Sequence, residues 1–120
     1  MRILIVDDNI DSADLMGEIL RSEGHEVAVA HDGAAGLAQF ARFHPELAIL
    51  DLGLPEIDGY ALARQVRADP EHHATTLIAL SGYAQAEDIA RSRDAGFTHH
   101  LAKPVDWKRL EAVISSTAHG

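Results

Sequence analysis

Five short apolar runs, each followed by residues with helical periodicity, restrict the folds open to this chain of 120 residues. The runs have the length of strands, are rich in aliphatic residues, and end on polar residues. The segments between them are too long for hairpins and suit helical crossovers between parallel strands. The alternation therefore predicts one α/β domain over residues 1–120, built on a doubly wound parallel sheet of five strands.

The strands are expected over residues 2–6, 26–30, 47–51, 77–80 and 98–102. The helices are expected over residues 11–23, 34–44, 59–68, 85–95 and 106–117. Asp11 and Asp106 are the expected N-caps of the first and last helices, and Gly24 is expected to end the first. The spacing of apolar residues predicts that the first two helices bury Leu15, Met16, Ile19, Leu20, Ala34, Leu37, Ala38 and Ala41.

The composition of the chain narrows the classes of molecule that it could bind directly. The formal net charge of −9 argues against direct binding to nucleic acid or to an anionic membrane. No apolar run reaches the length of a membrane span and the amino terminus lacks the features of a signal peptide, so we expect a cytoplasmic protein. The absence of cysteine removes disulfides and thiolate metal sites from consideration.

Polar side chains lie at four of the predicted strand ends. They are Asp7 and Asp8 after the first strand, Asp51 at the third, Ser81 at the fourth and Lys103 at the fifth. Because parallel strands share one carboxyl edge, these groups should converge in a crevice there. Close carboxylates raise one another's pKa unless a cation neutralises them, and Mg²⁺ prefers such oxygen ligands. The cluster predicts a phosphoryl site in which Asp51 is the nucleophile, Lys103 a counter-charge and Ser81 a hydroxyl donor.

The DD pair, the aspartate of LDLGLPEIDGY, the SGY after the fourth strand and the KP after the fifth resemble the receiver domain of bacterial two-component response regulators. No single motif is specific, but their joint order and spacing are, and the resemblance covers essentially the whole chain. It implies a flavodoxin-like sheet in strand order 2-1-3-4-5, with two helices on one face and three on the other. The amino-acid sequences of these motifs are most similar to those of receivers in hybrid sensor histidine kinases or single-domain regulators.

The resemblance also implies a function. Asp51 would accept a phosphoryl group from a phosphohistidine of a sensor histidine kinase or a histidine phosphotransfer protein. Mg²⁺ would be held by Asp8, Asp51 and the Gly53 carbonyl, with Asp7 assisting partly through water. Phosphorylation and slow dephosphorylation would be self-catalysed, and the domain would be a monomer or weak dimer.

In the family the lysine pairs with the phosphorylated group, the serine moves to bond its oxygens, and the Lys103–Pro104 peptide is cis. Many members carry Tyr or Phe three residues before the lysine, where this chain has His100. This leaves two routes for the activation switch open: His100 moves in and out together with Ser81 in place of the aromatic residue, or the output runs through the fourth helix and fifth strand by another route. Gly53 and Tyr83 occupy positions that tune the lifetime of the aspartyl phosphate in the family.

Other readings of these residues stay open. Alone, the Asp7–Asp8 pair is more typical of a turn or a helix cap than of a metal site. A degenerate receiver that only binds a partner is one alternative, and it is disfavoured because no expected site residue is missing. A Mg²⁺-dependent phosphatase is another, but Gly53 stands where such an enzyme has a second acid. The eight histidines lack the spacing of a metal site, and we expect most of them on the surface.

Overall fold

The computed structural model describes residues 1–54, 57–82 and 86–119, and in these ranges strands and helices alternate as expected. Its elements are β1 (Arg2–Val6), α1 (Ile10–Ser22), β2 (Glu26–Ala30), α2 (Gly33–Phe43), β3 (Leu47–Asp51), α3 (Gly59–Ala68), a 3₁₀ turn (Pro70–His72), β4 (Thr76–Ser81), α4 (Ala86–Ala95), β5 (His99–Ala102) and α5 (Trp107–His119). Gln85, the expected start of the fourth helix, lies outside the described residues.

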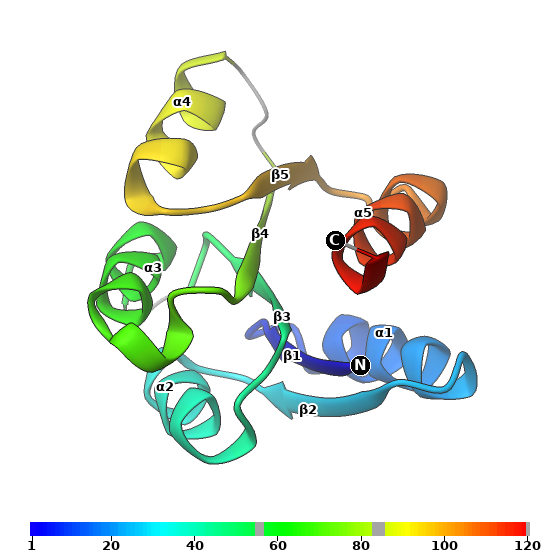
Figure 1. The fold of residues 1–120 in the computed structure, drawn as a ribbon. Helices are drawn as coiled ribbons and strands as arrows, with labels where there is room; N and C mark the ends of the chain where they lie inside the picture. The colour runs from blue at the N-terminus through cyan, green and yellow to red at the C-terminus, as the bar shows by residue number, and fades with distance from the viewer. Residues whose placement is uncertain (55–56, 83–85, 120) are drawn as a thin grey trace.

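The strands form one parallel sheet in the order β2-β1-β3-β4-β5. Helices α1 and α5 cover one face, and α2, α3 and α4 cover the other (Figure 1). The predicted α/β fold, strand order and division of helices are thereby confirmed. Among the described residues, no helix is both long and apolar enough to cross a membrane.

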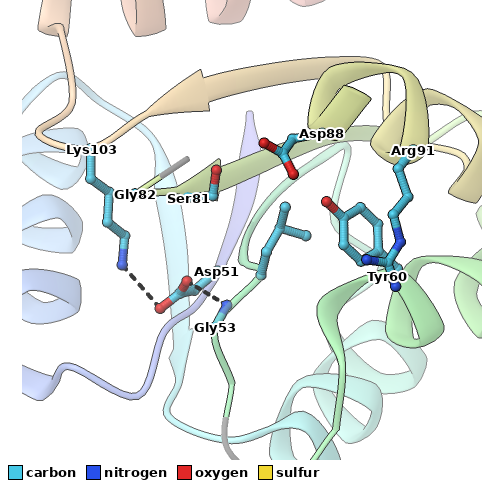
Figure 2. Close-up of a pocket in the computed structure, with 9 residues that line it drawn as sticks. Asp51, Gly53, Tyr60, Ser81, Gly82, Asp88, Arg91 and Lys103 are labelled. Atoms are coloured by element: carbon cyan, nitrogen blue, oxygen red, sulfur yellow. Dashed lines mark hydrogen bonds and ion pairs between the residues drawn. The ribbon is translucent and has the colours of Figure 1, made fainter. Parts of the chain in front are cut away.

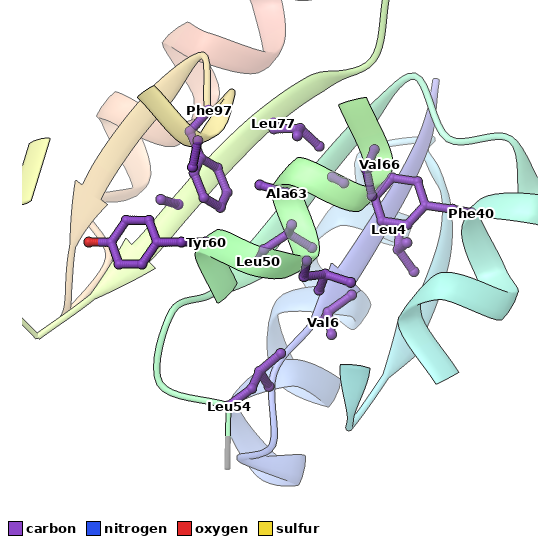
Figure 3. Close-up of a cluster of buried hydrophobic side chains, with 14 of the residues drawn as sticks. Leu4, Val6, Phe40, Leu50, Leu54, Tyr60, Ala63, Val66, Leu77 and Phe97 are labelled. Atoms are coloured by element: carbon purple, nitrogen blue, oxygen red, sulfur yellow. The ribbon is translucent and has the colours of Figure 1, made fainter. Parts of the chain in front are cut away.

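Side chains alternate between the two faces of the sheet, as the period of a strand requires. On β1, Ile3 and Ile5 pack toward α1 and α5, whereas Leu4 and Val6 pack toward α2 and α3. Figure 3 shows the second cluster, which extends from Phe40 on α2 to Phe97 beside β5. Because the central strands are buried on both faces, they fix the positions of the residues at their carboxyl ends.

The expected packing faces of α1 and α2 were partly wrong. Leu15 is 58% exposed, and on α2 the expected Ala34, Ala38 and Ala41 are exposed, whereas Leu37 is partly buried against the core as expected. The buried residues of α2 are Gly33, Gly36 and Phe40. A Cβ on Gly36 would lie 3.0 Å from Cγ2 of Val6, so the glycine lets α2 approach β1 closely. Counting apolar residues missed Gly33 and Gly36 because glycine adds nothing to a hydrophobic pattern.

The residues that cap the amino-terminal ends of α1 and α5 lie in the loops at the carboxyl edge of the sheet. Asn9, not Asp11, caps α1, because its side-chain oxygen accepts a hydrogen bond of 3.1 Å from the Ser12 N–H. Asp106 is confirmed as a cap, since its carboxylate accepts a hydrogen bond from the Lys108 N–H. The caps fix where the chain leaves each strand and enters the next helix.

One histidine departs from the expected surface location. His72 is 4% exposed and packs edge-on against Phe40, with 5.4 Å between ring centroids. Its Nε2 lies 3.8 Å from a carboxylate oxygen of Asp69. His72 therefore serves as a packing residue under the turn that precedes β4.

Candidate functional site

The residues expected at the strand ends do converge at one edge of the sheet. Asp51 ends β3, Ser81 ends β4, and Lys103 follows β5, so three chain segments meet beside the Asp51 carboxylate (Figure 2). Asp7 joins them from the end of β1, where its carboxylate lies 3.7 Å from Nζ of Lys103. The parallel topology alone brings these groups together, because each lies just beyond the carboxyl end of its strand.

Asp51 is only 5% exposed, and each of its carboxylate oxygens has a donor. The Gly53 N–H donates to Oδ1 at 2.9 Å, and Nζ of Lys103 donates to Oδ2 at 3.0 Å. These two bonds hold the carboxylate in a single orientation at the floor of the crevice. A carboxylate held in this way is suited to attack at a fixed direction.

Asp7, Asp8 and Asp51 form an acidic cluster whose nearest carboxylate oxygens all lie within 4.8 Å of one another. Asp7 is buried and Asp8 is exposed, and within the described parts of the chain Lys103 is the cation that contacts the cluster. Three carboxylates against one ammonium leave an excess of negative charge. An all-oxygen set of donors, open to water at Asp8, fits a hard divalent cation such as Mg²⁺.

The pKa directions follow from this geometry. Burial, followed by the neighbouring Asp51 carboxylate, raises the pKa of Asp7 above its ordinary value of 3.8. Burial also acts to raise the pKa of Asp51, but donors from Gly53 and Lys103 outweigh it and the net pKa is lowered. Burial lowers and the carboxylates raise the pKa of Lys103, with a net rise. Asp51 therefore stays ionised, and the first proton taken up by this pair goes to Asp7.

A cavity of about 500 Å³ opens above Asp51 and extends to α3 and α4. Its far wall includes Tyr60 of α3 and Arg91 of α4, whose guanidinium carbon lies 4.3 Å from the centre of the Tyr60 ring. Arg91 also pairs with Asp58 at 3.6 Å. Sequence reasoning missed these residues, since they belong to helix faces with no motif of their own.

A second cavity, of about 530 Å³, lies between the start of α1 and the start of α5. Asp7 and Lys103 reach it from the acidic cluster, and Leu15, Met16 and Trp107 supply apolar surface. The exposed Leu15 thus lies beside the acidic cluster rather than on a distant part of the surface.

Ser81 and His100 contact each other across β4 and β5. Oγ of Ser81 lies 2.8 Å from Nε2 of His100, and Nδ1 of the same ring lies 3.1 Å from Oγ of Ser92 on α4. Ser92 was not singled out in the sequence. The Lys103–Pro104 peptide is cis, as the resemblance implies. Tyr83 lies outside the described residues.

The comparison with known families decides the identity of the domain. The family model of the response regulator receiver domain matches residues 3–115. The chain belongs to this family. Among solved structures, a response regulator receiver domain protein of Methanospirillum hungatei superposes with a TM-score of 0.88 at 32% identity, covering 98% of this chain and 94% of that chain.

Two curated relatives show how the receiver occurs in other proteins. An uncharacterized 14.6 kDa protein of Leptolyngbya boryana is 40% identical over 106 residues, which are 88% of this chain and 81% of that protein. The DNA-binding dual master transcriptional regulator RpaA of Synechocystis is 33% identical over 94% of this chain. The receiver spans only 47% of RpaA, about half its length.

Proposed function

We propose that the receiver accepts a phosphoryl group on Asp51 from a phosphohistidine of a sensor histidine kinase or a histidine phosphotransfer protein. The observation that carries the proposal is the Asp51 carboxylate, held by Lys103 and Gly53 beside two further carboxylates. This arrangement supplies a nucleophile, a cation for a second phosphoryl oxygen and ligands for a metal ion.

Mg²⁺ would be held by Asp8, Asp51 and the backbone carbonyl of Gly53, with Asp7 assisting partly through water. When bound, the ion offsets the negative charge of the phosphoryl oxygens and of the carboxylates. Lys103 contributes a second positive charge, since its ammonium already donates to Oδ2 of Asp51.

In the transfer, an Asp51 oxygen forms a bond to phosphorus while the bond from phosphorus to the donor imidazole nitrogen breaks. The imidazole leaves with the electron pair and takes up a proton from solvent. Lys103 and the Ser81 hydroxyl then donate hydrogen bonds to phosphoryl oxygens. Hydrolysis of the aspartyl phosphate by water later restores Asp51. Both reactions take place on the receiver's own aspartate, so the receiver is not an enzyme that turns over a separate substrate.

The partner must bring its phosphohistidine to the mouth of the crevice. The cavity between α1 and α5 offers apolar surface from Leu15, Met16 and Trp107 directly beside Asp7 and Lys103. Ile10 and Leu15 are more than half exposed, so α1 can bury apolar surface against a partner helix. We expect the partner to present apolar and basic residues around its histidine.

The test uses a small acyl phosphate, with and without Mg²⁺, and measures the intact mass of the protein. We expect one phosphoryl group per chain that requires Mg²⁺ and is absent from Asp51→Asn. The matched control, Asp94→Asn on α4, changes the same charge at an exposed site and should be labelled like the wild type. Absence of label, together with failure to bind Mg²⁺ and beryllofluoride, would favour a degenerate receiver instead.

A further inference from the structure

We propose that Ser92 and His100 form a positioning pair that sets the direction of the Ser81 hydroxyl proton and connects it to α4. This inference rests on the proposed function, in which Ser81 donates to the phosphoryl group. It adds to that function a residue on α4 and a defined protonation form of the histidine ring.

A continuous series of hydrogen bonds runs from the backbone of α4 to Ser81. Ser92 Oγ donates to the carbonyl oxygen of Ile89 at 2.8 Å. The same oxygen lies 3.1 Å from Nδ1 of His100, and Nε2 of that ring lies 2.8 Å from Oγ of Ser81. Ser92 is 2% exposed, so water does not compete for its hydroxyl.

The direction of each proton follows from the first bond. A serine hydroxyl has one hydrogen, and that of Ser92 is given to the Ile89 carbonyl, which can only accept. Ser92 therefore accepts from His100, and Nδ1 of the ring carries the hydrogen. In the neutral imidazole Nε2 is then an acceptor, so the Ser81 hydroxyl donates to it.

This arrangement competes with the role of Ser81 at the phosphoryl group. Figure 2 shows the Ser81 hydroxyl turned away from the Asp51 carboxylate. To donate to a phosphoryl oxygen, Ser81 must give up its bond to His100 Nε2. The histidine thus opposes the phosphorylated arrangement until the stronger, charge-assisted bond to phosphate replaces its own.

The pair also makes α4 sensitive to whether the Ser81 hydroxyl donates to His100 or to the phosphoryl group. Ser92 and Ala95 are the buried residues of the described part of α4, so apolar burial holds this helix weakly. The bond between Ser92 and His100 is a polar contact that connects α4 to β5. A change at Ser81 reaches α4 through the imidazole ring of His100.

The first test is the protonation form of His100 in the free protein, measured by ¹⁵N NMR of the histidine rings at a pH where the ring is neutral. We expect Nδ1 to carry the hydrogen in the wild type. Ser92→Ala removes the acceptor, and the ring should shift toward the form protonated at Nε2. Ser92→Thr restores a hydroxyl and should restore the wild-type signals. A wild-type ring protonated at Nε2 would overturn the proposal.

The second test measures beryllofluoride affinity in the presence of Mg²⁺. Ser92→Ala should bind about two- to tenfold more tightly than the wild type, the range of one net hydrogen bond. Ser22→Ala is the matched control, because Ser22 Oγ makes the same type of bond to the carbonyl of Ile19 on α1. An affinity of Ser92→Ala equal to that of Ser22→Ala would contradict the proposal.

The two tests separate this inference from the function on which it rests. The protonation form of His100 is read without any phosphoryl analogue, whereas beryllofluoride binding depends on Asp51. A wild type that binds no beryllofluoride would overturn the proposed function. A wild type that binds it, with His100 protonated at Nε2, would overturn only the positioning pair.

Discussion

Nζ of Lys103 donates a hydrogen bond of 3.0 Å to Oδ2 of Asp51, although the two residues are 52 positions apart in the chain. The bond spans the carboxyl ends of β3 and β5, with β4 between them. This contact depends on the order of the strands in the sheet, and it pairs the proposed nucleophile with its cation.

Replacing Lys103 with alanine should weaken both folding and phosphoryl binding. We expect a loss of about 1 kcal/mol in the free energy of unfolding, since the lysine is partly exposed and solvent screens the pair. The net pKa of Lys103 is raised, so its contribution is complete below 10.5 and is lost as pH rises through the higher folded value. Urea unfolding of the wild type and of Lys103→Ala, at pH values below and above 10.5, measures the difference in stability between them.

The exposed Lys108 on α5 provides the control for Lys103. Lys108→Ala removes the same charge away from the acidic cluster and should leave unfolding within about 0.5 kcal/mol of the wild type. Equal losses for the two variants would show that the contact with Asp51 contributes no stability.

Asp7→Asn should stabilise the metal-free protein. The folded state raises the pKa of Asp7, so ionising it costs stability as pH rises above 3.8, and the amide avoids that cost. In EDTA at pH 7 we expect a gain of about 0.5–2 kcal/mol in urea unfolding. The gain should vanish at pH values below 3.8, where the wild-type carboxyl is protonated in both states. A loss of stability at pH 7 would contradict this account of the cluster.

Trp107 should report Mg²⁺ binding. It is the single tryptophan of the chain and shares a cavity with Asp7 and Lys103. We expect Mg²⁺ to change its fluorescence and, at 100 times Kd, to stabilise the protein by about 2.7 kcal/mol. Asp8→Asn should abolish both effects, whereas Asp94→Asn on α4 should preserve them. A normal response in Asp8→Asn would remove this residue from the site.

Gly59 at the start of α3 should not tolerate a side chain. A Cβ there would lie 2.7 Å from Cα of Leu52, in the loop that directly follows Asp51. Gly59→Ala should therefore lose about 1–3 kcal/mol in denaturant unfolding and be labelled more slowly by an acyl phosphate. Gly82→Ala is the control for folding, because a Cβ on Gly82 meets no atom of the described residues within 4 Å. Equal stability of the two variants would contradict the close approach.

Periodicity and strand-end residues were sufficient to predict the sheet and the meeting of Asp7, Asp51, Ser81 and Lys103. The reason is topological: a polar residue that ends a buried parallel strand has one edge on which to lie. The strong signal came from the strands, which are continuous apolar runs with defined ends.

What the sequence did not predict depends on contacts between segments. Ser92 acquires its role only because α4 places it against His100, and no local pattern encodes that pairing. His72 is buried because the turn before β4 folds over Phe40, although a histidine in a polar loop is usually exposed. Glycine contacts such as Gly36 against Val6 are likewise invisible to a hydrophobic pattern.

The most direct test of the central claim is to identify the residue that carries the phosphoryl group. After labelling with an acyl phosphate and Mg²⁺, borohydride reduction converts a phosphorylated aspartate to homoserine, which peptide mass spectrometry can locate. The account predicts homoserine at position 51 and nowhere else. Homoserine at another aspartate, or label that persists in Asp51→Asn, would contradict it.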